Sequence, residues 1–600
     1  MPIGPLLNFV RRNRAAILQA NGDATSFCLA LVAERRDNLL VGEALDLLAP
    51  LDGNEREYAI SSAYALLIGA DRRKLLSAYF TPPILAEAAL QAADQFLGGS
   101  SPTVLDPACG GGAFLAPVAH RLAAARVAQG MSAEMAVKQA LQGLKGIELD
   151  SGLASLSQAL LKAMMLRRFG VSADCNIVQT QNALSVAPQP IFDLVIGNPP
   201  YGRVAGRVSD ELLTNAGRAN IGGHTNLYGL FLLRGLEWLK PGGGLVFVLP
   251  TSFVAGPYFS GLRHEVLQKA EVLRIDVHEQ RDDLFVDAVQ DVCVLTLRRR
   301  REAVEPTTGP AHAYEMGLVD SQGVRRPLGR AEATTNGEPW MLPHAFSAAT
   351  TKRLSLISAG ERPAVLANYG YGIRVGKVVP TRERDHLRLK PDDGLLPLLW
   401  ASEARPDGSF AFANGKRSKL ASWYAPPTSG TLPYVTERPA VIVQRTSNRD
   451  QKRRLNAAAV PPTFYREHAP QGFVAENHVI VLEALTETPL VPPPVVAALL
   501  NSAPVNERFS AVSGSFSVSA KLLARLALPP AAALPTVITT DFDELVRIAL
   551  DSVAGVLATL EPSGDPQDAV DQSRDLGGPA TVDEEAGFQG GAVAQPKDIG

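Results

Sequence analysis

Short apolar runs alternate with longer amphipathic stretches through the middle of the chain. The runs that are short enough to be buried strands are 103–108, 143–150, 175–180, 192–200, 243–253, 271–279 and 290–299. Between several of them, apolar residues recur at helical spacing, as in 112–129 and 155–169. Strands that alternate with helices are typical of a parallel, doubly wound sheet. The pattern therefore predicts an α/β fold for this part of the chain.

The segments on either side of this alternation differ from it in composition. The N-terminal part is rich in Ala and Leu at helical spacing, and the part from 561 onward is acidic and rich in Gly, Asp, Gln and Ser. The expected division is a helical segment at 1–75, an α/β domain at 76–305, a polar linker at 306–335, a mixed α+β domain at 336–535, a C-terminal helix at 536–560 and a disordered tail at 561–600.

The net charge of −3 conceals an asymmetry along the chain. Residues 361–530 contain 21 Lys and Arg against 14 Asp and Glu, whereas residues 531–600 contain 3 against 13. A basic block inside a near-neutral protein is a weak indication of a polyanionic partner. A solvated surface explains the same charge equally well.

The four cysteines are far apart in the sequence, and none lies in a CxxC motif or a Cys/His cluster. This spacing argues against a zinc site and against a disulfide framework. No apolar run reaches the length of a membrane span, and the first residues lack the long apolar core of a secretory signal. We expect a reduced, cytoplasmic protein that uses no metal.

A glycine-rich turn follows the first predicted strand, in the sequence VLDPACGGGAFL. Gly110, Gly111 and Gly112 allow a tight turn and leave room for a ligand, and ligands of open α/β sheets lie at the carboxyl ends of the strands. The pattern is neither GxGxxG nor a P-loop, so phosphate binding is not favoured. An ordinary turn is the alternative interpretation.

Polar residues also follow the next two strands. Glu148, at the end of the run 143–150, is placed to bind both hydroxyls of a ribose. Asn182, after the run 175–180, could contact the edge of an adenine through its amide. A solvated carboxylate at a strand end is the alternative for Glu148.

The tetrapeptide Asn198-Pro199-Pro200-Tyr201 follows the apolar run FDLVIG. The prolines restrict the backbone and remove two donors, which leaves the Asn198 amide oxygen and the Pro199 carbonyl as fixed acceptors. An aromatic amino group is a poor nucleophile, and two acceptors on it would stabilise the positive charge that develops during methyl transfer. Tyr201 offers a flat face for stacking. A plain strand-end turn would explain the tetrapeptide alone, but not its order after the glycine-rich turn.

The motifs YFTPP, DPACGGGAFL, GIELD and NPPYG, in this order, resemble the gamma class of adenine-N6 DNA methyltransferases, the TaqI-like and Eco57I-like type II modification methylases. The resemblance is close over about 76–300 and loose beyond it. It implies a Rossmann-like domain that uses S-adenosylmethionine, followed by a domain for target recognition. The cofactor contacts that it implies are Tyr79, Thr81, Asp106, Ala108, Gly110, Glu148 and Asn182. An Asp is usual at the last of these positions.

The resemblance also implies how the reaction is organised. The catalytic residues would be Asn198, Pro199, Pro200 and Tyr201, and Phe285 would be a second aromatic that holds the base, although a core aromatic is an alternative for it. Because an adenine amino group inside a duplex cannot be reached, the nucleotide must be flipped out of double-stranded DNA. We expect the Gly- and Arg-rich stretch 202–225 to become ordered on the substrate. A separate restriction endonuclease is a candidate partner.

The strongest basic cluster of the C-terminal half lies in QRTSNRDQKRRLNA. Arginine can bond guanine or phosphate, and amide side chains can bond adenine. The predicted DNA-binding residues are Arg445, Arg449, Lys452, Arg453 and Arg454. A charged, solvated face is the alternative for this cluster.

Two other enzyme classes use the same NPPY chemistry, namely protein-glutamine and ribosomal-RNA N-methyltransferases. The YFTPP segment and the large C-terminal half favour DNA over both. A DNA-binding subunit with a degenerate methyltransferase fold is the non-enzymatic alternative, which the intact motifs disfavour. The chain shows no PD-(D/E)xK or HNH-like nuclease motif, so modification without cleavage is expected.

Overall fold

The structure is a computed structural model of the whole chain. It describes residues 2–76, 80–173, 176–202, 226–256, 259–278, 291–302, 312–333, 340, 342, 364–413, 420–427, 435–446, 453–513, 518–534 and 544. The expected C-terminal helix at 536–560, apart from Glu544, and the expected tail at 561–600 lie outside these residues.

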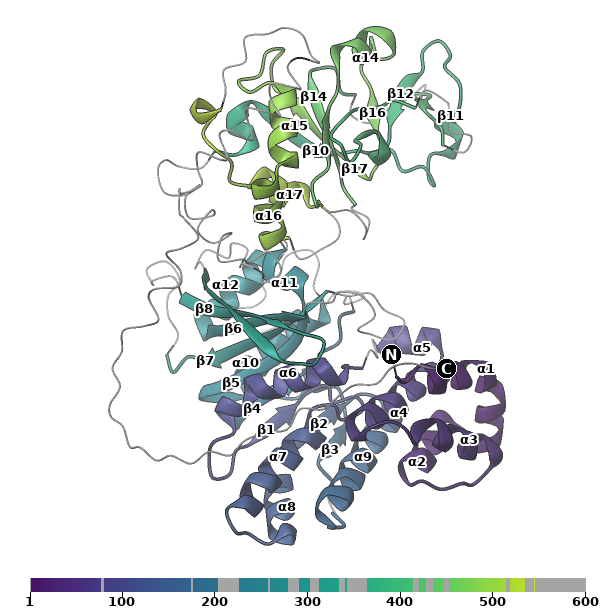
Figure 1. Ribbon diagram of the computed structural model, residues 1–600, viewed down its shortest axis with the longest axis vertical. Helices are drawn as coiled ribbons and strands as arrows, with labels where there is room; N and C mark the ends of the chain where they lie inside the picture. The colour runs from purple at the N-terminus through teal and green to yellow at the C-terminus, as the bar shows by residue number, and fades with distance from the viewer. Residues whose placement is uncertain are drawn as a thin grey trace, which may run out of the picture.

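A nine-stranded sheet forms the centre of the N-terminal half (Figure 1). Its strand order is β3-β2-β1-β4-β5-β7-β6-β8-β9, and the strands β1 to β5 are parallel to one another. The order reverses between β1 and β4, which is the doubly wound, Rossmann-like arrangement that the sequence pattern predicts. The first five strands are β1 (Val104–Asp106), β2 (Leu144–Glu148), β3 (Val178–Thr180), β4 (Phe192–Gly197) and β5 (Leu239–Pro250).

Helices cover both faces of this sheet because alternate strand residues point to opposite sides. Leu194 and Ile196 of β4 pack into the core that contains α6, α7 and α8, whereas Val195 packs with α10 and α12 on the other face. These helices are α6 (Pro83–Ala93), α7 (Leu115–Ala128), α8 (Ala133–Gln142), α10 (Leu227–Trp238) and α12 (Ser260–Lys269). The segments expected to be helical at 112–129 and 155–169 correspond to α7 and to α9 (Ser151–Phe169).

The parallel arrangement that the sequence pattern predicts extends only as far as β5. Strand β7 (Val292–Arg299) lies between β5 and β6 (Ala270–His278) and is antiparallel to both. No helical stretch separates the apolar runs of β6 and β7 in the sequence, and an antiparallel neighbour needs no crossover helix. The sheet is therefore mixed, with its parallel part on the side of β1.

Residues 312–333, which the sequence analysis assigns to a linker, form two strands that extend the sheet. Strand β8 (His312–Val319) is parallel to β6, and β9 (Arg325–Ala333) is antiparallel to β8. The buried Asp276 of β6 accepts from Arg325 Nε at 2.8 Å and pairs with Arg274. Strands at the edge of a sheet can be polar when their charges are paired. The polar composition of this stretch therefore resembles that of a linker in the sequence.

The N-terminal helices pack as one group beside α9 (Figure 1). Their apolar side chains share a core with Leu153, Leu156 and Leu160 of α9. The buried carboxylate of Asp150, the N-cap of α9, accepts from Tyr64 Oη at 2.6 Å and from Arg72 at 2.7 Å. The helices are α1 (Gly4–Asn21), α2 (Ala24–Val32), α3 (Leu39–Leu48), α4 (Gly53–Ile68) and α5 (Ala70–Leu76).

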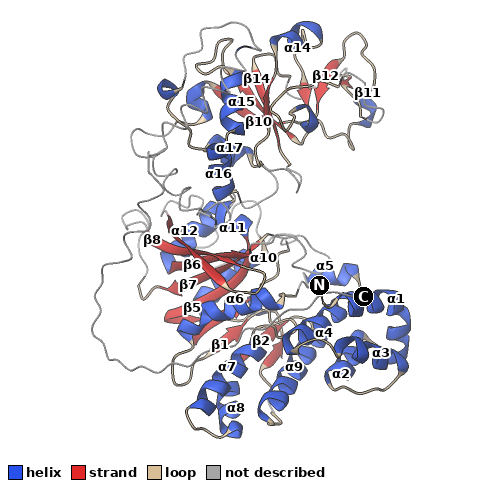
Figure 2. Ribbon diagram, viewed as in Figure 1, coloured by secondary structure: helices blue, strands red, loops and turns tan. Residues whose placement is uncertain are grey.

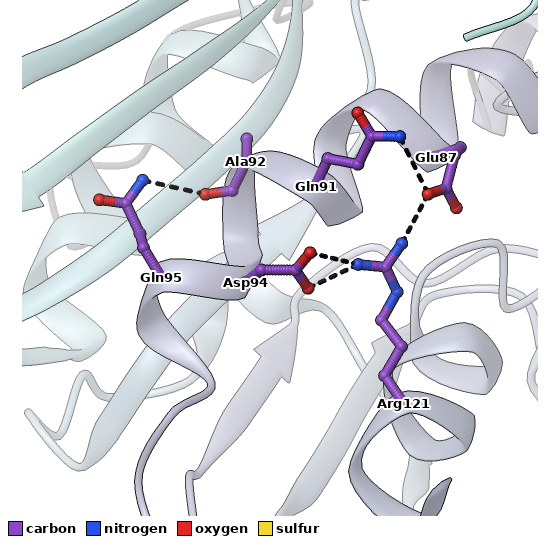
Figure 3. A network of polar contacts seen from close by, with 6 residues as sticks. All are labelled: Glu87, Gln91, Ala92, Asp94, Gln95 and Arg121. Atoms are coloured by element: carbon purple, nitrogen blue, oxygen red, sulfur yellow. Dashed lines mark hydrogen bonds and ion pairs between the residues drawn. The ribbon is translucent and has the colours of Figure 1, made fainter. Parts of the chain in front are cut away.

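A polar network joins α6 to α7 (Figure 3). Arg121 of α7 donates to both oxygens of Asp94, at 2.5 and 2.6 Å, and to Glu87 of α6 at 2.7 Å. Helix α6 begins at Pro83, directly after Thr81 and Pro82, and α7 follows the glycine-rich turn. The network thus links α6 and the residue that follows it to the middle of α7.

The C-terminal half is a mixed α+β unit (Figure 2). One four-stranded sheet has the order β10-β17-β14-β15 and the other has the order β11-β13-β12-β16. The strands are β10 (Tyr371–Val375), β11 (Leu387–Arg388), β12 (Leu396–Leu399), β13 (Trp423–Tyr424), β14 (Ala440–Gln444), β15 (Ala457–Ala459), β16 (Val474–Ala475) and β17 (Val479–Ala484). The helices are α14 (Pro462–Glu467), α15 (Pro493–Asn501), α16 (Ala503–Val512) and α17 (Ala520–Ala524).

No single helix among the described residues has the length and apolar character of a membrane span. Helices α1 and α2 together would have them, but the two meet at a bend of 93°.

Gly152 marks the closest approach between the N-terminal helices and α9. A Cβ atom at this position would lie 2.2 Å from Tyr64 Oη and 2.4 Å from Thr25 Oγ1. We expect Gly152→Ala to lower the free energy of unfolding by about 1–3 kcal/mol, because the extra methyl group pushes these helices apart. Urea unfolding monitored by circular dichroism measures the change. Gly4→Ala is the matched control because its Cβ meets no atom within 4 Å, and an equal loss in both variants would contradict the steric explanation.

Candidate functional site

The glycine-rich turn after β1 lies beneath residues of the N-terminal part. Gly110 and Gly112 have φ values of +50° and +78°, which favour glycine. A Cβ atom at Gly111 would lie only 2.1 Å from Ser61 Oγ of α4, and one at Gly110 would lie 3.4 Å from the Phe80 ring. The turn therefore needs glycines for its backbone angles and for the close contact with α4 and Phe80. The sequence analysis did not foresee that contact.

Two buried carboxylates lie at the ends of β1 and β2. Glu148 accepts from the backbone N–H of Gly110 at 2.9 Å and from that of Asp150 at 2.9 Å. Asp106 is fully buried, and its Oδ1 accepts from the N–H of Ala108 at 3.1 Å. Its Oδ2 has no hydrogen-bond partner among the described residues. This edge of the sheet thus has one buried carboxyl oxygen whose hydrogen-bonding capacity the described residues do not use.

Burial disfavours the charged form of both carboxyl groups. It raises the pKa of Asp106 to about 8, although the Ala108 N–H lowers that pKa and the charge of Glu148 raises it further. Burial also raises the pKa of Glu148, against the opposing effect of its backbone donors. Without a positively charged ligand, burial therefore favours the protonated form of Asp106.

Asn182 is exposed and acts as a cap of a short helical turn. Its side-chain oxygen accepts from the N–H of Leu184 at 3.1 Å. The exposed Leu149, directly after Glu148, was not singled out from the sequence, although 60% of it is accessible beside the carboxylates. An exposed leucine at the ligand-facing end of a strand offers an apolar surface to a flat ring.

The side chain of Asn198 is held at both ends. Its Nδ2 donates to Thr81 Oγ1 at 3.0 Å, and its Oδ1 accepts from the Tyr201 hydroxyl at 2.6 Å. That hydroxyl also lies 3.1 Å from the Val248 carbonyl of β5, and its single hydrogen can go to only one of the two acceptors. Thr81, predicted as a cofactor contact, is buried and in direct contact with the tetrapeptide.

Aromatic side chains support Tyr201 from the inside. The Tyr228 ring of α10 meets the Tyr201 ring edge-on, with centroids 6.2 Å apart, and Phe259 lies 5.6 Å from Tyr228. Tyr228 is almost completely buried, so it positions Tyr201 rather than facing a ligand. The sequence analysis missed Tyr228, because nothing in the segment NLYGLF separates a supporting ring from an ordinary core residue.

Several predicted site residues lie outside the described part of the chain. They are Tyr79, Phe285, Arg449, Lys452 and the stretch 203–225.

Two described arginines of the predicted DNA-binding cluster are used inside the fold. Arg445 donates to the Asn477 carbonyl at 2.8 Å. Arg453 donates to the Asn501 carbonyl at 2.9 Å and also to the Pro406 carbonyl. Each therefore anchors loops of the C-terminal unit, and Arg454 likewise has internal contacts.

The carboxylates, the glycine-rich turn and the tetrapeptide lie at the carboxyl ends of β1, β2 and β4. This is the point where the strand order reverses, at which ligands of doubly wound sheets bind. The described residues contain no group of three or more His, Cys, Asp or Glu side chains that could hold a metal ion. The arrangement offers acceptors for donors and cations, together with a flat aromatic residue.

Comparison with known proteins identifies similar enzymes. Residues 160–285 match the family model described as Eco57I restriction-modification methylase. Type II methyltransferase M.BsuBI of Bacillus subtilis is 25% identical over 56% of this chain and 65% of its own length. Type II methyltransferase M.PstI of Providencia stuartii is 24% identical over 61% of this chain and 70% of its own length. These matches confirm the resemblance to type II modification methylases.

One solved structure with a similar arrangement is the type IIL restriction-modification enzyme MmeI in complex with DNA. It is 12% identical and has a TM-score of 0.49, and the match covers 88% of this chain and 82% of that chain.

The raised pKa of Asp106 gives a testable pH dependence. Between about pH 4, where an unfolded Asp loses its proton, and pH 8, the folded chain binds more protons than the unfolded chain, so this group's contribution to stability falls as the pH rises. We expect Asp106→Asn to be more stable than the wild type near pH 8 by about 1–3 kcal/mol, and to lose this advantage toward pH 4. Urea unfolding without cofactor measures it.

Asp193→Asn serves as a control of opposite sign. Asp193 pairs with Lys240 at 2.8 Å, and its contacts hold its pKa below the usual range despite partial burial. Its contribution to stability is present above an ordinary Asp pKa, so the variant should be less stable than the wild type near neutral pH. A pH-independent difference for Asp106→Asn would contradict the prediction.

Proposed function

We propose that this chain, which resembles type II modification methylases, transfers a methyl group from S-adenosylmethionine to the N6 atom of adenine in double-stranded DNA, as the modification enzyme of a restriction-modification system. The observation that carries the proposal is the Asn198 amide, held at both ends beside the buried carboxylates of β1 and β2. Target recognition is assigned to the C-terminal unit within 336–535, and the catalytic unit is taken to extend to Ala333, where the sheet ends.

The residues at the switch point fit S-adenosylmethionine. Glu148 keeps lone pairs for the two ribose hydroxyls. The unpartnered Oδ2 of Asp106 would suit the positive charge of the cofactor once this carboxyl group has lost its proton. Gly110 and Ala108 leave room at the turn, and Leu149 offers an apolar face to the adenine ring. Asn182 can add an amide contact, and Tyr79 would complete the site. When bound, the cofactor supplies an electrophilic methyl group.

Asn198 and Pro199 supply the acceptors for the reacting amino group. The nitrogen lone pair of adenine N6 is delocalised into the ring, and acceptors for both N–H groups favour the geometry in which it becomes nucleophilic. The same acceptors stabilise the positive charge that develops on the nitrogen. Because Asn198 is fixed before the base arrives, this stabilisation needs little reorganisation.

Thr81 and Tyr201 determine what the Asn198 amide can do. The bond from Nδ2 to Thr81 orients the amide so that Oδ1 remains the acceptor. In the free protein the Tyr201 hydroxyl donates to that oxygen, and the Val248 carbonyl is a second acceptor at 3.1 Å. When the target amino group arrives, the hydroxyl can turn to Val248 and leave Oδ1 to the base.

Base flipping explains the aromatic residues of the site. Unstacking a nucleotide costs a few kcal/mol, and contacts in the pocket must replace the lost stacking. Tyr201, supported by Tyr228, would stack on the flipped base, and Phe285 would hold its other side. Pro200 stiffens the backbone between these contacts and Asn198.

Methylation mapping in cells tests the function directly. The full chain is expressed in a host without adenine methylation, and modified bases are mapped by long-read sequencing. We expect N6-methyladenine at one short sequence motif, and its loss in Asn198→Ala, because the variant lacks the side-chain acceptor. The absence of any DNA methylation by a folded, cofactor-binding wild type would reject DNA as the substrate, and methylated protein glutamine or ribosomal RNA would then identify the true one.

The orienting role of Thr81 gives a separate prediction. Thr81→Val removes the hydroxyl that accepts from Asn198 Nδ2. We therefore expect kcat to fall about 10- to 100-fold, while KM for DNA and the affinity for S-adenosylmethionine change little. Thr81→Ser keeps the hydroxyl and should retain most of the rate. Steady-state kinetics and calorimetric titration of the cofactor measure these quantities. A loss of cofactor affinity in Thr81→Val with unchanged kcat would show that Thr81 binds the cofactor instead.

A further inference from the structure

The basic side chains of the C-terminal unit fall into two groups. Arg445 and Arg453 of the cluster predicted from the sequence donate to backbone carbonyls within the fold. A second basic group lies earlier, in the segment 377–390 between β10 and the end of β11, which the sequence analysis did not single out. The two groups differ in how much of their hydrogen-bonding capacity is free for a partner.

All five cations of the segment 377–390 are exposed, namely Lys377, Arg382, Arg384, Arg388 and Lys390. Arg388 donates to two nearby backbone carbonyls, those of Asp385 and Leu387. Within the described part of the chain, Arg382, Arg384 and Lys390 make no side-chain hydrogen bond or ion pair. Their donors face water and are available to an external acceptor.

The acidic residue between the two free arginines is turned inward. Glu383 accepts from the N–H of Val379 at 3.0 Å and from the Tyr424 hydroxyl at 2.8 Å. Its two oxygens therefore accept hydrogen bonds within the fold and form no ion pair with Arg382 or Arg384. Three acidic residues nearby are exposed: Asp385 lies inside the segment, and Asp392 and Asp393 follow it. The last two limit the basic surface on the side of β12.

The segment is held in a fixed conformation. The backbone N–H groups of Arg382 and Glu383 donate to the Val379 carbonyl, and β11 pairs with β13 at the edge of its sheet. His386 stacks on the Tyr424 ring, with centroids 5.5 Å apart, and its Nδ1 lies 2.8 Å from the Ala425 carbonyl. Little backbone entropy is lost if such a segment binds a partner.

The segment also meets the cluster predicted from the sequence. The N–H of Asn477 donates to the Val378 carbonyl, and the N–H of Arg445 donates to the His478 carbonyl. Lys377 and Arg445 therefore both lie beside the turn 476–478. A ligand on the segment 377–390 would therefore reach the surroundings of Arg445.

We propose that the segment 377–390 binds the phosphate backbone of double-stranded DNA and sets the position of the duplex on the C-terminal unit. The proposal rests on the proposed function, and it assigns backbone binding to the free arginines rather than to the anchored ones. Exposed arginine and lysine donors are satisfied by phosphate oxygens, and each neutralised phosphate releases counterions. The predicted binding is therefore strongly salt-dependent and independent of sequence.

The test measures the binding of a short fluorescent DNA duplex to the full chain at several salt concentrations. We expect the double variant Arg382→Ala/Arg384→Ala to bind about ten-fold more weakly, and the slope of log K against log salt to become shallower by about 2, close to one for each lost phosphate contact. Arg12→Ala/Lys138→Ala is the matched control, because both of these side chains are exposed and lie outside the C-terminal unit. The control should bind like the wild type.

Cofactor affinity and thermal unfolding, measured in parallel, should be unchanged in both double variants. An unchanged slope for Arg382→Ala/Arg384→Ala would overturn the proposal, as would tighter binding of an RNA duplex than of the DNA duplex by the wild type.

The methylation map separates this proposal from the proposed function. A wild type that methylates DNA, together with arginine variants that bind DNA normally, rejects only the binding surface. A wild type that binds the duplex through these arginines but leaves host DNA unmethylated rejects the proposed function and supports the surface.

Discussion

The burial of Asp106 and Glu148 is the constraint on which the α/β unit depends. A carboxylate removed from water must find donors nearby, or else it takes up a proton. Glu148 finds two backbone N–H groups, one of which belongs to Gly110 in the turn after the neighbouring strand. The turn is thereby tied to β2, and its glycines allow the backbone to approach. Asp106 is left with one buried oxygen that has no donor among the described residues, and burial favours its protonated form.

The N-terminal helices belong to this site in a physical sense. Ser61 of α4 lies against Gly111, and Tyr64 and Arg72 hold the carboxylate of Asp150, whose own N–H donates to Glu148. A displacement of these helices would therefore change the positions of the carboxylates, either through the contact of Ser61 with Gly111 or through the hydrogen bonds of Asp150. Contacts that hold these helices in place also keep the acceptors of the site in place. A site whose function depends on preorganised acceptors, rather than on a mobile loop, needs such contacts.

The same reasoning separates the two basic groups of the C-terminal unit. Arg453 lies near Arg454 in the sequence and looks like part of a binding surface, but the fold uses its guanidinium to join two loops. Arg382 and Arg384 are separated by Glu383, so the sequence around them is less basic than the cluster that contains Arg453. They differ because their guanidinium groups make no hydrogen bond or ion pair within the described part of the chain, and because the carboxylate of Glu383 between them accepts from Val379 and Tyr424 instead. Charge density along a chain thus says less about binding than the number of donors that the fold leaves unused.

The sequence by itself determined the strands β1 to β7, the glycine-rich turn and the tetrapeptide, because each rests on short-range rules of alternation, backbone angle and chemistry. It also determined the order of the motifs, and with that order the resemblance to modification methylases. Only the tertiary structure decided that residues 312–333 extend the sheet and that Thr81 contacts Asn198, since a polar edge strand and a hydrogen bond across 117 positions leave no local pattern. The partner of a side chain is fixed by packing between distant segments, which no stretch of sequence encodes alone.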